Sequence, residues 1–111
     1  MMLGLGLALV LAAQQAPALT SYEEMVRCAG LTQAASELAG GEGAEAKALM
    51  DAALYWSLTA LQAATAAGKS PTVAEADQTR ARIQSVRLLS SGAPEARAAL
   101  QTCRQRVPDL G

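Results

Sequence analysis

The stretch AEAKALMDAALYWSLTALQAATAA, residues 44–67, decides the fold of this chain. An apolar series with alternating spacings of three and four residues runs through it: Ala46, Leu49, Ala53, Trp56, Ala60, Ala63 and Ala67. This spacing is the period of an amphipathic helix, and alanine is the strongest helix former. Gly68 follows directly, and glycine commonly ends a helix. We therefore predict one long helix over residues 44–67.

A second apolar stripe lies beside the first on the same predicted helix. It consists of Met50, Leu54, Leu61 and Ala64. A helix that is apolar on two adjacent sides is typically packed against more than one neighbour. We therefore expect residues 44–67 to form the central helix of the fold.

A shorter helix is predicted before the long one. Ser21 and Glu24 have the spacing of a capping box, so this helix begins there and ends at residue 38 or 39, before Gly40. The residues expected on its apolar stripe are Cys28, Leu31, Ala35 and Leu38. Those expected on its other side are Arg27, Gln33 and Glu37.

Two more helices are predicted after the long one. Ser70 followed by Pro71 predicts a helix that extends to about residue 90, and Pro94 opens a last helix that Pro108 ends. The residues expected to point inward on the first of these helices are Val73, Ala76, Ile83 and Val86. Those expected on the buried stripe of the last helix are Ala96, Ala99, Leu100, Cys103 and Val107.

These patterns predict an all-α fold, a small antiparallel bundle of about four helices. Short turns that contain glycine or proline connect the helices, which favours antiparallel neighbours. The alternative is two stacked helical hairpins that resemble a repeat, because Gly40 and Gly92 both follow predicted helices.

Residues 1–18, MMLGLGLALVLAAQQAPA, are predicted to be a secretory signal peptide. The apolar run at 3–13 is followed by Ala16-Pro17-Ala18, which has the small residues of a cleavage site. The alternative is a buried N-terminal helix, because no lysine or arginine precedes the run. We expect cleavage after Ala18, which leaves a single helical domain over residues 19–111. That domain would have no membrane anchor and would lie in a bacterial periplasm or outside the cell.

Cys28 and Cys103 are the only cysteines. A lipid anchor requires a cysteine directly after the signal run, and a redox site is usually a C-x-x-C pair, so neither fits Cys28. In an up-and-down bundle the two cysteines lie at similar heights near one end. An exported chain with an even cysteine count commonly forms disulfides. We therefore predict a Cys28–Cys103 disulfide that closes the bundle, and two separate buried thiols are the alternative.

The chain contains no histidine, which excludes Ser-His-Asp and Cys-His catalysis and the common zinc sites. No phosphate-binding glycine motif occurs in the predicted domain. Glu23, Glu24, Glu42 and Glu45 lie in first helical turns, where carboxylates stabilise the helix dipole whatever the function. We predict that the protein is not an enzyme, and we expect no catalytic residue, metal site or cofactor.

Charge is divided unevenly along the predicted domain. Residues 19–68 carry six acidic against two basic side chains, a balance of −4, and residues 69–111 carry seven basic against four acidic, a balance of +3. Solvated helix faces explain this division, and an arginine-rich surface for an anionic partner is the alternative. The formal net charge of −1 gives no field that attracts nucleic acid, so we expect no nucleic-acid partner.

Tyr55 and Trp56 are the candidates for contact with a partner. Core packing accounts for both, but Tyr55 falls off the main apolar stripe and is expected to be partly exposed. The predicted function is binding, as a protein-interaction or chaperone-like module. A carrier of a small apolar ligand and an enzyme of unknown class are the alternatives. No motif specifies the protein partner or the oligomeric state.

Overall fold

The computed structural model describes residues 21–109 of the chain. This part contains four α-helices and no strand: α2 (Tyr22–Leu38), α3 (Gly43–Ala66), α4 (Pro71–Ser90) and α5 (Pro94–Gln105). The predicted all-α bundle of four helices closed by one disulfide is confirmed. The proposed signal peptide, residues 1–18, lies outside the described residues and stays a prediction.

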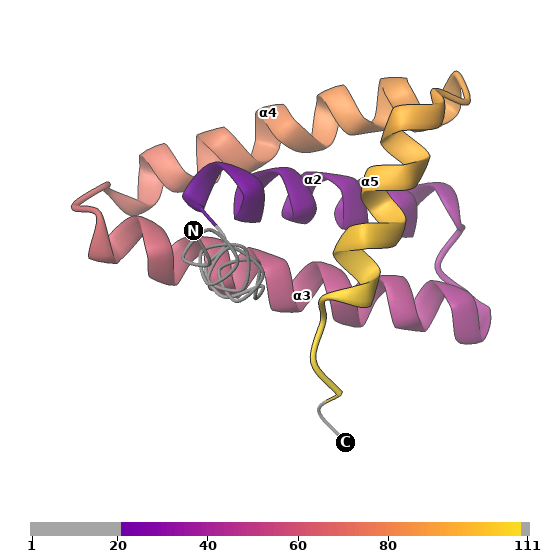
Figure 1. The fold of residues 1–111 in the computed structure, drawn as a ribbon, viewed down its shortest axis with the longest axis horizontal. Helices are drawn as coiled ribbons and strands as arrows, with labels where there is room; N and C mark the ends of the chain where they lie inside the picture. The colour runs from indigo at the N-terminus through magenta and orange to yellow at the C-terminus, as the bar shows by residue number, and fades with distance from the viewer. Residues whose placement is uncertain (1–20, 110–111) are drawn as a thin grey trace, which may run out of the picture.

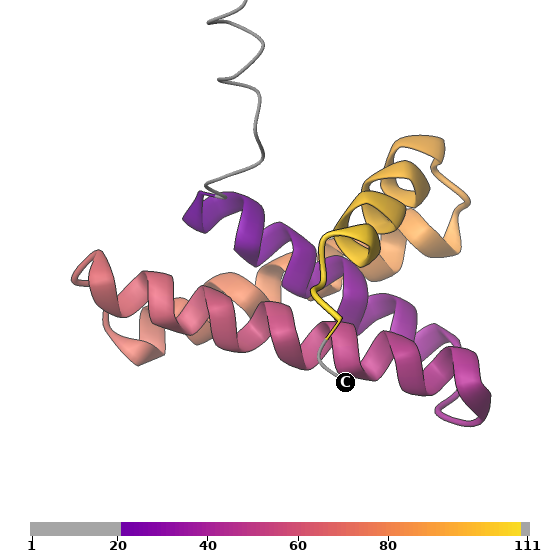
Figure 2. The same ribbon diagram turned by 60° about the horizontal axis from the view of Figure 1, so that its bottom comes forward.

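Three helices lie along the long axis of the molecule, and the fourth crosses them. Figure 1 shows α3 running back along α2 and α4 returning in the direction of α2. From the end of α4, α5 turns across α2 toward α3, as the rotated view in Figure 2 also shows. Since α2 packs against all three other helices and buries eight of its 17 residues, it is the central helix, and the prediction that residues 44–67 take this position is wrong.

Helix starts follow the sequence closely, and one helix end does not. The Ser21 hydroxyl accepts from the backbone N–H of Glu24, and the Glu24 carboxylate accepts from the N–H of Ser21, which completes the predicted capping box. Ser70 caps α4, also as predicted. The last helix, however, ends at Gln105. The ring of a proline disfavours helical geometry at the residue before it, so the chain leaves the helix before it reaches Pro108.

The contact between α2 and α4 depends on small residues. Gly30, near the middle of α2, is buried against Ala81 of α4. A Cβ atom added to Gly30 would lie 2.6 Å from the carbonyl carbon and 2.7 Å from the Cβ of Ala81. Such distances are shorter than van der Waals contact, so the two helices approach this closely because Gly30 has no side chain.

The inward face of α4 differs from the predicted one. Its buried residues are Ala74, Gln78 and Ser85. Val73 and Ile83, which were expected to point inward, are 45% and 43% exposed. α4 therefore buries small and polar side chains, keeps Val86 and Leu89 half-buried, and leaves Val73, Ile83 and Leu88 exposed.

A hydrogen-bonded cluster of three side chains explains this orientation. The Gln33 amide nitrogen donates to the Ser57 hydroxyl at 2.6 Å and to the Gln78 side-chain oxygen at 3.4 Å. Gln78 in turn donates to the main-chain carbonyl of Ser57 at 3.4 Å. Gln33 was expected on the outer side of its helix, but it is half-buried where α2, α3 and α4 meet. Because buried polar groups must keep their hydrogen bonds, this cluster fixes which face of α4 is inward.

Candidate functional site

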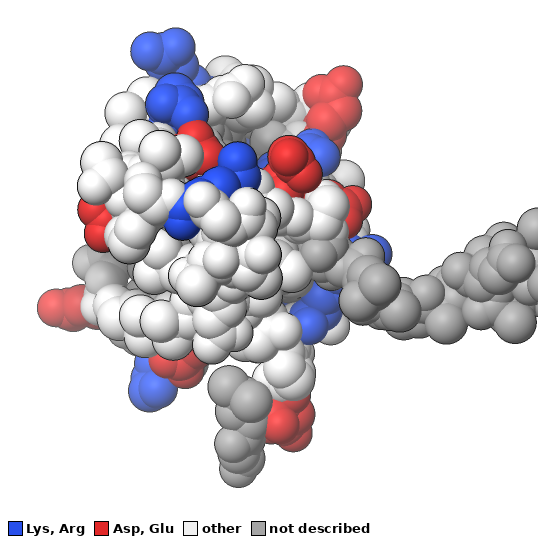
Figure 3. Space-filling view, turned by 90° about the vertical axis from the view of Figure 1, so that its left-hand side faces the viewer, with Lys and Arg blue, Asp and Glu red and all other residues white. Residues whose placement is uncertain are grey.

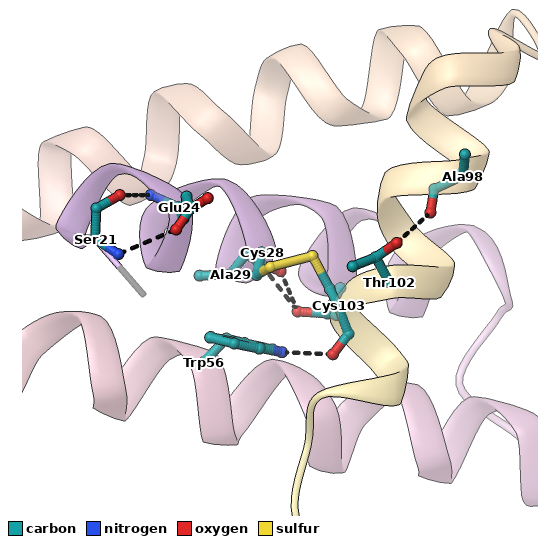
Figure 4. Close-up of a disulfide and its surroundings, with 9 residues drawn as sticks. Ser21, Glu24, Cys28, Ala29, Trp56, Ala98, Thr102 and Cys103 are labelled. Atoms are coloured by element: carbon teal, nitrogen blue, oxygen red, sulfur yellow. Dashed lines mark hydrogen bonds between the residues drawn. A yellow bond between two sulfur atoms is a disulfide. The ribbon is translucent and has the colours of Figure 1, made fainter. Parts of the chain in front are cut away.

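Cys28 and Cys103 join the middle of α2 to the last turn of α5 (Figure 4). Their Cα atoms are 5.5 Å apart, and both side chains are buried. The predicted disulfide is confirmed, and no free cysteine exists in the described part of the chain. This pair is therefore a covalent link between helices, shielded from solvent.

Trp56 belongs to the core around the disulfide. It is only 2% exposed, and its indole nitrogen donates to the main-chain carbonyl of Cys103 at 3.1 Å (Figure 4). The Tyr55 ring meets the Trp56 ring edge-on with centroids 5.1 Å apart, and Tyr55 is half-buried. Of the two aromatic candidates for partner contact, Tyr55 is the one that reaches the surface.

α3 exposes three of its large aliphatic side chains. Met50, Leu54 and Leu58 are 48%, 58% and 58% exposed, and their spacing of four residues places them on one face of the helix. The buried residues of the same helix are mostly alanine: Ala46, Leu49, Ala52, Ala53, Trp56, Ala60 and Ala64. We call Met50, Leu54 and Leu58 the α3 stripe. Two of its members, Met50 and Leu54, belong to the second apolar stripe predicted from the sequence. That stripe was expected to be packed by a neighbour, but these two residues face solvent, and only Ala64 of its four residues is buried.

A groove of about 620 Å³ adjoins the α3 stripe. It lies between α3 and the segment that follows α5, and its apolar lining consists of Leu54, Tyr55, Leu58, Val107 and Pro108. Its polar lining consists of Asp51, Thr59, Gln62 and Asp109. No lysine or arginine contributes to this lining. We call this hollow the α3 groove, and because it shares two leucines with the α3 stripe, the two form one continuous surface.

The sequence indicated only part of this surface. Tyr55, Met50 and Leu54 were identified from their positions on the helix. Leu58 was missed, although it follows Leu54 by four residues and extends the same face. Val107 and Pro108 had been assigned to the end of a helix, and they reach the groove because the helix ends earlier.

An ion pair holds the C-terminal turn of α5 to the first turn of α3. The Arg104 guanidinium donates to both carboxylate oxygens of Glu45, at 2.7 and 3.1 Å. These hydrogen bonds lower the pKa of the Glu45 carboxyl and raise the pKa of Arg104. The Glu45 carboxylate thus has a partner in Arg104, which links α3 to α5.

Charged groups at the opposite end of α3 are also paired. The Tyr22 hydroxyl donates to Asp77 at 2.7 Å, and Arg80 donates to the same carboxylate. Burial, followed by the hydrogen bond to Asp77, raises the pKa of Tyr22 to about 12. Figure 3 views the molecule from this end and shows positive and negative side chains interspersed, with no continuous patch of one sign.

Within residues 21–109, no group of three or more His, Cys, Asp or Glu side chains is placed to hold a metal ion. None of the four described helices is both long and apolar enough to cross a membrane. Comparisons with protein-family models, with curated proteins and with solved structures gave no match for this chain. The α3 stripe and groove therefore stand as the candidate functional site on their geometry.

Proposed function

We propose that this protein acts by binding another protein through the α3 stripe and the adjoining α3 groove. The observation that carries the proposal is that α3 buries mostly alanine, with Leu49 and Trp56, and exposes Met50, Leu54 and Leu58 on one face. The partner would supply an apolar surface that covers these side chains.

The energetics of burial support this reading. Moving a leucine or methionine side chain from water into a protein interior stabilises it by roughly 1.5–3 kcal/mol. α3 forgoes that stabilisation at three positions of one face while alanines occupy its core side. Single exposed leucines are ordinary, but adjacent ones that form a patch beside a groove are typical of protein-interaction sites.

We further propose that this binding takes place outside the cytoplasm. A disulfide between two buried cysteines is typical of oxidising compartments. The apolar run at 3–13 and the sequence Ala16-Pro17-Ala18 have the pattern of a cleavable export signal. Edman sequencing of the protein recovered from an exporting cell tests this, with Leu19 expected as the first residue.

Site-specific photo-crosslinking tests the proposed binding surface. A photoreactive amino acid is placed at Leu58 in the full chain, and the protein is irradiated in the extract of the compartment that contains it. We expect discrete adducts with other polypeptides, identified by mass spectrometry, and we expect Leu54→Asp to remove them. Because Leu54 is 58% exposed, this variant should keep the fold, which circular dichroism checks.

Leu38 provides the matched control for this experiment. It is 51% exposed at the end of α2, away from the α3 groove lining. The photoreactive residue at Leu38 should give none of the adducts found at Leu58. Equal adducts at both positions, or Leu58 adducts that persist in Leu54→Asp, would contradict the proposal.

The α3 groove also favours a second candidate, a carrier of a small apolar ligand. Its volume of about 620 Å³ falls within the roughly 300–1,000 Å³ of ligand-binding pockets. Native mass spectrometry of the purified protein separates the two functions. A co-purifying small molecule that is lost in Leu54→Asp supports the carrier, whereas ligand-free protein together with Leu58 adducts supports protein binding.

A further inference from the structure

The outer face of α4 carries exposed aliphatic side chains and arginines, which complement the apolar and acidic lining of the α3 groove. Five residues spaced by three or four positions share this face: Val73, Ala76, Arg80, Ile83 and Arg87. Val73 and Ile83 are about as exposed as Met50 of the α3 stripe. Arg80 is bonded to Asp77, whereas Arg87 forms no ion pair with any residue of the described part of the chain. We call this face the α4 stripe.

The charges of the two surfaces are complementary. The α3 groove is lined by the carboxylates of Asp51 and Asp109 and by no lysine or arginine. Asp51 lies 3.2 Å from Lys47, but both side chains are largely exposed, and such surface pairs are weak. An incoming arginine can therefore compete with Lys47 for the Asp51 carboxylate at the edge of the groove. Packing one α3 groove on another would instead bring like charges together, which opposes that arrangement.

The two surfaces also match in length. From Met50 to Leu61, one turn beyond the α3 stripe, the helix rises about 16 Å over 12 residues, and from Val73 to Arg87 the α4 stripe rises about 21 Å over 15 residues. A helix that presents apolar anchors at these spacings can lie along an apolar groove on another helix. Such a contact is smaller than the roughly 800 Å² per partner of stable complexes, so it should be reversible.

We propose that a second copy of this chain occupies the α3 groove and presents its α4 stripe to it. This inference rests on the proposed function, because it names the partner of the same surface. The contact joins two different faces, so one molecule can bind a copy through α3 and another through α4. Apolar burial supplies the attraction, and the arginines of α4 set the orientation.

Sedimentation velocity of the purified protein, from micromolar to millimolar concentration, tests this self-association. We expect the wild-type chain to associate as its concentration rises and to do so less at high salt. Leu58→Asp and Ile83→Asp should each weaken association by about tenfold or more, because each places a charge in the buried centre of the contact. Leu38→Asp, on neither surface, should associate like wild type.

Mixing the two variants tests the pairing of unlike faces. Leu58→Asp retains an intact α4 stripe, and Ile83→Asp retains an intact α3 groove. An equimolar mixture should therefore form a one-to-one complex at concentrations at which each variant is monomeric. If Ile83→Asp associates like wild type while Leu58→Asp does not, α3 pairs with α3 and the proposal is overturned.

Arg87 tests the electrostatic part of the contact. Arg87→Glu should weaken association severalfold, whereas Arg87→Lys should retain most of it because the charge is kept. Arg97→Glu, an exposed arginine of α5, is the control and should have little effect.

If the wild-type chain stays monomeric at every concentration, the proposal that a second copy occupies the α3 groove is refuted. That result leaves the proposed function standing if Leu58 still gives adducts with other proteins. If the wild-type chain stays monomeric and Leu58 also gives no adducts, both proposals are refuted.

Discussion

Gly30 shows how a single missing methyl group sets the distance between two helices. Glycine inside a helix is less favourable than alanine by about 1 kcal/mol, so its presence in the middle of α2 needs a reason. The reason is the backbone of Ala81, which lies where a Cβ would be. The close approach of the helices brings Gln78 of α4 within hydrogen-bond distance of Gln33 on α2, at 3.4 Å. Gly30 is thus a packing residue.

Replacing this glycine gives a prediction whose sign is opposite to helix propensity. Gly30→Ala should lower the free energy of unfolding by about 1–3 kcal/mol, because overpacking forces α2 and α4 apart. Urea denaturation followed by circular dichroism measures the change. Ser36→Ala on the same helix is the control and should be near neutral. An increase in the urea midpoint for Gly30→Ala would show that α2 and α4 can move apart without loss of stability.

Tyr22 gives a pH-dependent prediction at the same scale. Burial and the hydrogen bond to Asp77 raise its pKa to about 12, above the ordinary value of 10.0. The folded protein therefore favours the neutral phenol, so the stability from this group is present below pH 10 and is lost as the pH rises toward 12. Tyr22→Phe should lower the melting temperature at pH 8 and should lose less on going to pH 11. If Tyr22→Phe loses as much stability between pH 8 and pH 11 as the wild-type chain, the raised pKa is not present.

At the scale of elements, two adjacent residues of α5, Cys103 and Arg104, make its covalent and polar links to α2 and α3. Cys103 forms the disulfide with α2 and accepts the indole hydrogen bond from α3 through its carbonyl, and Arg104 pairs with Glu45. Ala96 and Cys103 are the only residues of α5 that are fully buried. Burial of Ala96 therefore holds the first turn of α5, and the disulfide and the polar contacts hold its C-terminal end, which leads into the segment that lines the α3 groove.

The indole hydrogen bond can be removed separately from the disulfide. Trp56→Phe should lower the free energy of unfolding by about 1–3 kcal/mol, because the Cys103 carbonyl loses its indole donor in a buried site and some core volume is lost. It should also speed reduction of the disulfide by dithiothreitol, since a shielded disulfide reacts when the helix opens. Reduction followed by thiol counting measures this. Tyr55→Phe is the control. An unchanged reduction rate in Trp56→Phe would mean that the indole hydrogen bond to Cys103 does not hold α5 in place.

The sequence predicted the elements better than it predicted their orientation. The starts at Ser21 and Ser70 depend on local capping chemistry, and both are found in the structure. The inward face of α4 does not follow from local pattern, because its buried side is small and polar and is fixed by contacts with Gln33 and Ser57 on other helices. Hydrophobic periodicity assigns the largest aliphatic residues to the core, and here several of them lie outside it.

The same physical limit applies to the candidate site. Tyr55 could be identified because it departs from the main stripe of its helix. The groove could not, since it forms only where α5 crosses the bundle and the chain after Gln105 passes beside α3. That arrangement is a long-range contact, and the one sequence feature that indicated it was the pairing of Cys28 with Cys103.

For the whole molecule, the disulfide is the largest single contribution to stability that we can assign. It closes a separation of 75 residues, and in the chain-entropy model this removes about 4–5 kcal/mol of unfolded-state freedom. A domain of this size has a total stability of roughly 5–10 kcal/mol. Its core is built largely of alanine, so the covalent link replaces much of what larger apolar side chains would provide.

Removal of the disulfide should therefore have a global effect that reaches the α3 groove. Cys28→Ala combined with Cys103→Ala, or reduction of the wild-type chain, should lower the free energy of unfolding by about 2–5 kcal/mol in urea denaturation. Trp56 is the only tryptophan, so its fluorescence reports the release of α5, while circular dichroism reports the remaining helices. Reductant should have no effect on the double variant. If α5 separates first, fluorescence changes before helix content falls, and the Leu58 adducts decline with the fluorescence because the groove loses its second wall. Equal unfolding midpoints in the oxidised and reduced protein would show that packing alone holds α5 across the bundle.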